Sequence, residues 1–84
     1  MSNEIIKLDV PSVPDGFEWD YGFEIFVQSA LNGVTISANK AGLISLARHL
    51  LSLAKDDSPV GNHFHLDDLN SLEDGSIELI VEKI

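Results

Sequence analysis

The stretch FEIFVQSALNGVTISANKAGLISLARHLLSLA, residues 23–54, contains two strand patterns followed by one helix pattern. From residue 17 to residue 31 the odd positions are mostly large and apolar, whereas the even positions include acidic and polar residues. Such alternation is typical of a half-buried β-strand. Because this run is longer than most strands, we expect a break near Gly22 and a regular strand over 23–31.

Asn32 and Gly33 predict a two-residue hairpin turn, since both residue types tolerate positive φ. With these two residues as the loop, the apolar positions of both strands fall on one face. The expected cross-strand pairs are Leu31 with Val34, Ser29 with Ile36, and Val27 with Ala38.

A helix is predicted over about 40–55, with Asn39 as its N-cap. Apolar residues recur at helical spacing and should form the face that packs on the sheet: Leu43, Ile44, Leu46, Ala47, Leu50, Leu51 and Ala54. The opposite stripe should be solvated, and it consists of Ser45, Arg48, His49 and Ser52.

Further strands are predicted on both sides of this unit. Glu4–Val10 alternates and is ended by the Pro- and Gly-containing segment 11–16. A short extended segment at 63–67, a polar loop at 69–75 and a final strand at 77–84 follow the helix. We therefore expect one α+β domain over 1–84: an antiparallel sheet of about five strands, in the order β-β-β-α-β-β, with the helix on one face.

The composition excludes several classes of function. Five basic residues against fourteen acidic ones give a formal charge of −9, which disfavours nucleic acid and anionic membranes as partners. No cysteine is present, so thiolate chemistry and disulfides are excluded. The sequence has neither a signal-peptide pattern nor an apolar run long enough for a membrane span, and we expect a cytoplasmic protein.

The acidic residues gather in the last third of the chain. Residues 56–82 contain eight Asp and Glu side chains and neither Lys nor Arg. Such a surface either holds a cation or meets a basic partner. In its middle, His63, His65 and Asp67 alternate on a predicted strand and would share one face, which is the start of a zinc or iron(II) site. A remote ligand such as Glu78 or Glu82 would be needed to complete it.

Two other groups of residues are candidates for a functional role. Trp19 and Tyr21 flank Asp20 directly after a turn, and aromatic side chains beside acids are typical of interface hot spots. The alternative is that both aromatics are core residues that cover a sheet edge. Ser45 and His49 lie four apart on the helix, but no nucleophile elbow surrounds the serine and an exposed helix offers no oxyanion hole. We therefore predict no enzyme activity and no cofactor.

Two stretches resemble a known family. An Asn-x-x-Gly-Leu turn leads into the helix at Gly42 and Leu43, and a His-x-His-Leu-Asp strand at 63–67 precedes a Ser-x-Glu-Leu-x-x-Glu strand at 76–82. This combination resembles small immunity proteins of bacterial polymorphic toxin systems. The resemblance implies an antidote that binds and blocks a cognate toxin, often a basic enzyme. The residues that match the motif are Gly42, Leu43, His63, His65, Leu66, Asp67, Ser76, Glu78 and Leu79.

Together these observations favour an acidic binding protein whose partner is a basic toxin. The alternatives are a metal-binding protein or metal-dependent enzyme that uses His63 and His65, and a homodimer that pairs through an edge strand. The predicted partner-binding residues are Trp19, Asp20, Tyr21, His63, His65, Asp67, Asp68, Glu73 and Asp74.

Overall fold

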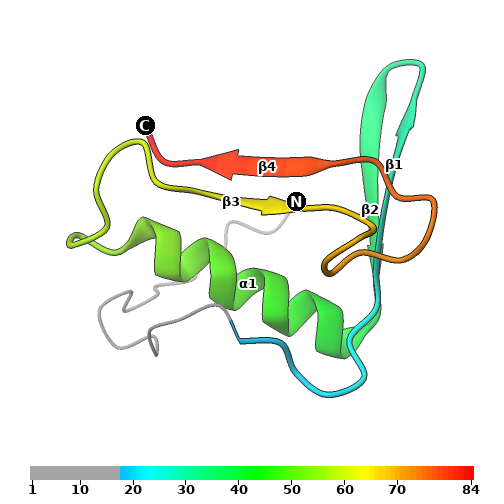
Figure 1. The fold of residues 1–84 in the computed structure, drawn as a ribbon, viewed down its shortest axis with the longest axis horizontal. Helices are drawn as coiled ribbons and strands as arrows, with labels where there is room; N and C mark the ends of the chain where they lie inside the picture. Colours follow the sequence, from blue (N-terminus) through cyan, green and yellow to red (C-terminus); the bar gives the residue numbers. More distant parts are fainter. Residues whose placement is uncertain (1–17) are drawn as a thin grey trace, which may run out of the picture.

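The computed structural model describes residues 18–84, so the strand predicted at Glu4–Val10 lies outside the described residues. The described part contains four strands and one helix (Figure 1). The elements are β1 (Ile25–Ala30), β2 (Gly33–Ala38), α1 (Lys40–Ala54), β3 (His63–Leu66) and β4 (Leu79–Glu82). The α+β class is confirmed. No helix in this part of the chain has the length and apolar character needed to cross a membrane.

The prediction of one five-stranded sheet was wrong for the part of the chain that the structure describes. β1 pairs with β2 and β3 pairs with β4, giving two separate antiparallel sheets. α1 runs alongside the β3–β4 sheet, whereas the β1–β2 hairpin stands across one end of it (Figure 1).

The segment before β4 explains why the two sheets stay separate. The Ile77 N–H donates to the carbonyl oxygen of Val27 at 2.8 Å, and the Glu73 N–H donates to that of Ile25 at 2.8 Å. The Ser76 hydroxyl accepts a hydrogen bond from the Val27 N–H at 3.1 Å. Residues 73–77 therefore bind along β1, and the final strand is limited to Leu79–Glu82 instead of the predicted 77–84.

The predicted hairpin register was also wrong, although the faces were right. The observed pairs put Val27 opposite Ile36 and Ile25 opposite Ala38. The turn lies at Leu31 and Asn32, one residue earlier than predicted. The turn does not use the positive φ that Gly33 permits, since the positive-φ glycines are at positions 22, 61 and 75.

Asn39 sets this register from the open end of the hairpin. Its N–H donates to the Glu24 carbonyl at 3.1 Å, and its Oδ1 accepts from the Glu24 N–H at 3.0 Å. Its Nδ2 donates to the carbonyl of Gly22 at 2.9 Å. The same Oδ1 caps α1 by accepting from the Gly42 N–H at 2.8 Å, so the predicted N-cap is confirmed. Gly22, with φ +78°, provides the break expected before the regular strand.

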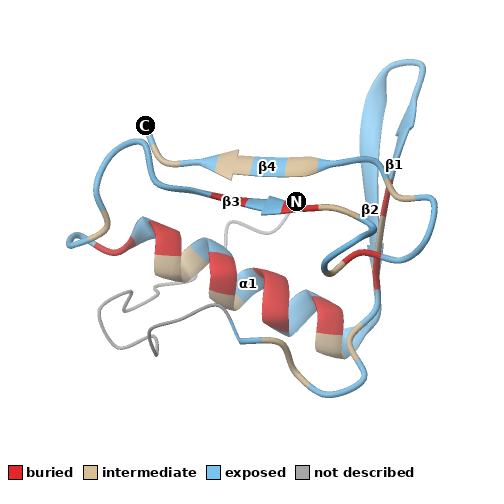
Figure 2. Cartoon of the chain, viewed as in Figure 1, coloured by how far each residue is buried: buried red, intermediate tan, exposed pale blue. Residues whose placement is uncertain are grey.

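The predicted core face of the helix was wrong in part. Leu46 is buried as expected, but Leu43, Ile44 and Leu50 are exposed. The buried stripe, visible as the red bands in Figure 2, consists of Gly42, Ser45, Leu46, His49 and Leu53. Two of these residues had been predicted to be solvated. Apolar spacing could not identify this stripe because small and polar residues form much of it.

The core lies between α1, β1 and the inner face of β3–β4. Its buried residues are Ile25, Val27, Leu46, Leu53, Phe64, Leu66 and Leu72. The alternation in β3 is confirmed, since Phe64 and Leu66 are buried while His63 and His65 are exposed. The segment 69–75 was predicted to be a polar loop, yet it places Leu72 in the core with 6% exposure.

Candidate partner-binding site

The outer face of the β3–β4 sheet points away from α1 and carries polar side chains from both strands. His63 lies opposite Glu82, and His65 lies opposite Ile80. These four residues and Glu78, which immediately precedes β4, are all exposed. We call this set of five residues the outer face of β3–β4.

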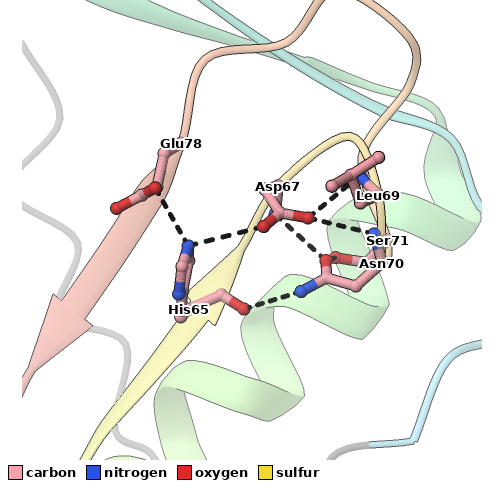
Figure 3. Close-up of polar contacts among 6 residues, drawn as sticks. All are labelled: His65, Asp67, Leu69, Asn70, Ser71 and Glu78. Carbon is pink, nitrogen blue, oxygen red and sulfur yellow. Dashed lines mark hydrogen bonds and ion pairs between the residues drawn. The ribbon is translucent and has the colours of Figure 1, made fainter.

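His65 lies between two carboxylates on this face (Figure 3). Its Nε2 is 3.2 Å from an Oε2 of Glu78 and 3.6 Å from the Oδ2 of Asp67. The three residues come from β3, the following turn and the position just before β4, so pairing of the two strands brings them together. Protonated His65 can satisfy both carboxylates, while neutral His65 leaves a negative surface suited to a cationic group.

Asp67 also organises the turn after β3. Its Oδ1 accepts from the N–H groups of Leu69 at 2.9 Å and Asn70 at 3.0 Å (Figure 3). Its carbonyl oxygen accepts from Leu72 N–H at 2.8 Å, which helps to turn Leu72 into the core. Asp67 is thus a structural residue, which the sequence pattern did not indicate.

Asn70 is a second turn residue that sequence reasoning missed. Its Nδ2 donates to the carbonyl of His65 at 3.1 Å, and its Oδ1 accepts from the Asp67 N–H at 3.0 Å. The Asp-x-x-Asn spacing from Asp67 is the signal that could have revealed it, because Asp and Asn side chains commonly bond to nearby backbone in turns.

A shallow groove of about 260 Å³ opens beside His65. Its walls come from two regions far apart in sequence, the segment that contains Trp19 and the strand β3. The groove is lined by Trp19, His49, Phe64, His65, Leu66, Asn70 and Ser71.

Among Trp19, Asp20 and Tyr21, only Trp19 lines this groove. Its ring stacks on Phe23 at 4.6 Å between centroids and lies 4.1 Å from the ring of His49. Tyr21 is fully exposed and does not line the groove. Asp20 forms an ion pair with Arg48 at 2.9 Å, and its N–H donates to the Ser45 hydroxyl at 2.8 Å. These bonds anchor the segment to α1.

The remaining predicted residues do not join the cluster around His65. Asp68, Glu73 and Asp74 are exposed. Within residues 18–84, no group of three or more His, Asp or Glu residues could hold a metal ion.

His49 was predicted to be solvated but is 1% exposed. Its ring lies against Trp19 and meets Phe64 edge-on at 5.6 Å, while its Nδ1 bonds to the Ser45 carbonyl at 2.7 Å. Burial lowers the pKa of His49 below its ordinary value of 6.5, and the charge of Arg48 lowers it further against the opposing Ser45 bond.

This burial predicts a pH dependence of stability. Below pH 6.5 the unfolded chain protonates His49 before the folded chain does, so the unfolded state binds more protons. The contribution of His49 is complete above pH 6.5 and is lost as the pH falls toward its folded pKa. NMR titration of the imidazole should place His49 below 6.5, and urea unfolding should show a weaker pH dependence in His49→Gln than in the wild type. A folded-state titration of His49 at or above 6.5 would contradict this expectation.

The sequence matches one known family over most of its length. Residues 33–84 match the family model of Immunity protein 32. The chain belongs to this family. Neither the curated proteins nor the solved structures gave a match. The matched region begins at β2, so β1 and the Trp19 segment lie outside it.

Six of the nine residues that carry the resemblance fall into two kinds. Gly42, Asp67 and Ser76 serve the fold, through close packing, a turn and a bond to β1 respectively. His63, His65 and Glu78 lie on the exposed outer face of β3–β4. The second kind is exposed and has no evident packing role among the described residues.

Proposed function

We propose that this immunity protein acts by binding a cognate basic toxin and blocking it, without catalysis of its own, in the cytoplasm of a bacterium. Family membership supports the immunity role, and the anionic outer face of β3–β4 supports a basic partner. The single observation that carries the binding site is the position of Glu78 and Asp67 around His65 on an exposed face.

The distribution of basic residues strengthens this proposal. Lys83 donates from its Nζ to the carbonyls of Lys55 and Ser58, at 2.7 Å each, at the end of α1. Arg48 is paired with Asp20. These two cations are therefore held within the fold. The carboxylates of the outer face of β3–β4 then have less positive charge near them, so they attract a basic partner more strongly.

We further propose that Trp19 and the groove beside His65 add specificity to this electrostatic attraction. Groove residues combine an aromatic wall with the polar rim formed by Asn70 and Ser71, and central aromatic anchors dominate many interfaces. The segment carrying Trp19 lies outside the family match, which suits a part that varies with the toxin. Exposed Tyr21, Asp68, Glu73 and Asp74 would form the surrounding contacts.

Reversing charge at Glu78 and at Glu82 of β4 should slow association with the cognate toxin domain. For Glu78→Lys combined with Glu82→Lys, we expect the association rate at low salt to fall about tenfold, because attraction between opposite charges steers the encounter. Stopped-flow fluorescence over a series of salt concentrations would measure it. Asp67→Lys is unsuitable as a test because it would also disrupt the turn.

The matched control is Asp56→Lys combined with Asp57→Lys, which changes the net charge equally on exposed residues in the turn after α1. We expect this control to slow association much less. An equal effect of both variants would refute a localised site on β3–β4, and unchanged rates in both would refute electrostatic steering. Failure of the protein to bind or protect cells from that toxin would refute the proposed pairing itself.

A further inference from the structure

Within residues 18–84, α1 carries a second apolar stripe that remains exposed. Leu43 is 54% exposed and Leu50 is 44% exposed, and Ala47 and Ala54 between and after them are also exposed. Spacings of four, three and four residues place all four side chains on one side of the helix. We call these four residues the α1 seam.

The seam is complementary to itself when reversed. Its order is Leu, Ala, Leu, Ala, so an antiparallel copy places Leu43 opposite Ala54 of the second copy and Ala47 opposite Leu50 of the second copy. Each large side chain then meets a small one. Helices pack closely when the large side chains of one helix enter the gaps beside small side chains of the other.

A groove next to the seam provides space for Leu43 of the second copy. It has a volume of about 180 Å³ and lies between α1 and β4. Its lining residues are Leu50, Leu53, Ala54, Val81 and Lys83. Because Ala54 belongs to both the groove and the seam, Leu43 of the second copy would arrive at this groove.

Charges at the two ends of the helix favour the same arrangement. Exposed Lys40 begins α1, and exposed Asp56 and Asp57 follow its end. None of these three has an ion pair to another residue within 18–84. An antiparallel pair brings Lys40 of each copy to the acidic turn of the other, whereas a parallel pair would place like charges together.

We propose that the α1 seam is the interface of a symmetric antiparallel homodimer. This surface differs from the edge-strand contact predicted from the sequence. The outer face of β3–β4 points away from α1, so each copy keeps its partner-binding face open, and the dimer does not depend on the proposed toxin binding. One helix per copy is a small interface, so the dimer should be weak and visible at roughly 10–100 µM protein.

Sedimentation equilibrium of the full chain from micromolar to millimolar concentration tests this inference. Ala47→Glu places a charge at the centre of the seam on an exposed helical site that tolerates glutamate. We expect it to raise the dimer dissociation constant at least about tenfold. Leu69→Glu is the control, since it makes an exposed leucine acidic in the turn after β3 and should leave the constant unchanged.

A charge exchange tests the antiparallel orientation. Lys40→Glu should weaken the dimer several-fold, and adding Asp57→Lys in the same chain should restore it, because opposite charges again meet across the interface. Circular dichroism would verify that each variant is folded. A monomer at every concentration up to the millimolar range would overturn the proposal. A dimer that Ala47→Glu leaves intact would assign the contact to another surface.

Discussion

Replacing Phe64 with alanine should lower the free energy of unfolding by about 3–5 kcal/mol, a large share of the stability of a domain of this size. Phe64 is 7% exposed on the inner face of β3 and meets the ring of His49 edge-on. Its removal would leave a cavity between the sheet and α1, at the point where β3, the helix and the Trp19 segment all meet.

Thermal unfolding followed by circular dichroism would measure this effect. We expect the Tm to fall by about 15–30 °C, given the usual relation between stability and Tm for small domains. The control is His65→Ala, since His65 is the next residue of the same strand but lies on the exposed face. This variant should change stability by less than about 1 kcal/mol, because it loses only exposed ion pairs. A similar loss in both variants would show that β3 does not have one buried face.

Substituting Gly42 with alanine should also destabilise the fold. A Cβ at this position would clash with the carbonyl oxygen of Glu24 and would lie 2.9 Å from the Cγ1 of Ile25. The first of these is backbone, so no side-chain rotation relieves the contact. We expect a net loss of about 1–3 kcal/mol from overpacking, even though alanine in a helix interior gains about 1 kcal/mol over glycine.

Gly33→Ala is the matched control, because nothing lies within 4 Å of a Cβ there and the φ of Gly33 is not positive. This variant should be neutral or slightly stabilising, since alanine reduces the entropy of the unfolded chain. Urea unfolding of both variants would compare them. Equal stability of Gly42→Ala and the wild type would mean that α1 does not approach β1 as closely as the structure indicates.

Much of the local structure could be predicted from the sequence. Asn39 as N-cap, the helix that follows it, and the alternation of β3 all depend on interactions between neighbouring residues, and all are confirmed. The break at Gly22 also depends on local backbone geometry. The family motif around His63 to Asp67 was recognisable for the same reason, since it is contiguous in sequence.

The candidate site could be predicted only in part. Alternation correctly placed His63 and His65 on one exposed face, but it could not show that Trp19 would lie beside them. Asp67 was predicted to be a partner-binding or ligand residue, and its Oδ1 also organises a turn. The position of Trp19 depends on contacts between segments distant in sequence, which no local pattern contains. The turn at Asp67, in contrast, is marked by the local Asp-x-x-Asn spacing.

The sequence by itself determined where the helix and three of the strands lie, the polarity of β3, and the acidic character of the last third of the chain. Only the tertiary structure decided that α1 buries Gly42, Ser45 and His49 in place of its more apolar stripe. The physical reason is close approach: Gly42 lets the helix reach the backbone of β1, and burial then falls on whatever residues share that side. Hydrogen bonds and ring contacts satisfy the two polar residues there, and the leucines of the α1 seam are left at the surface.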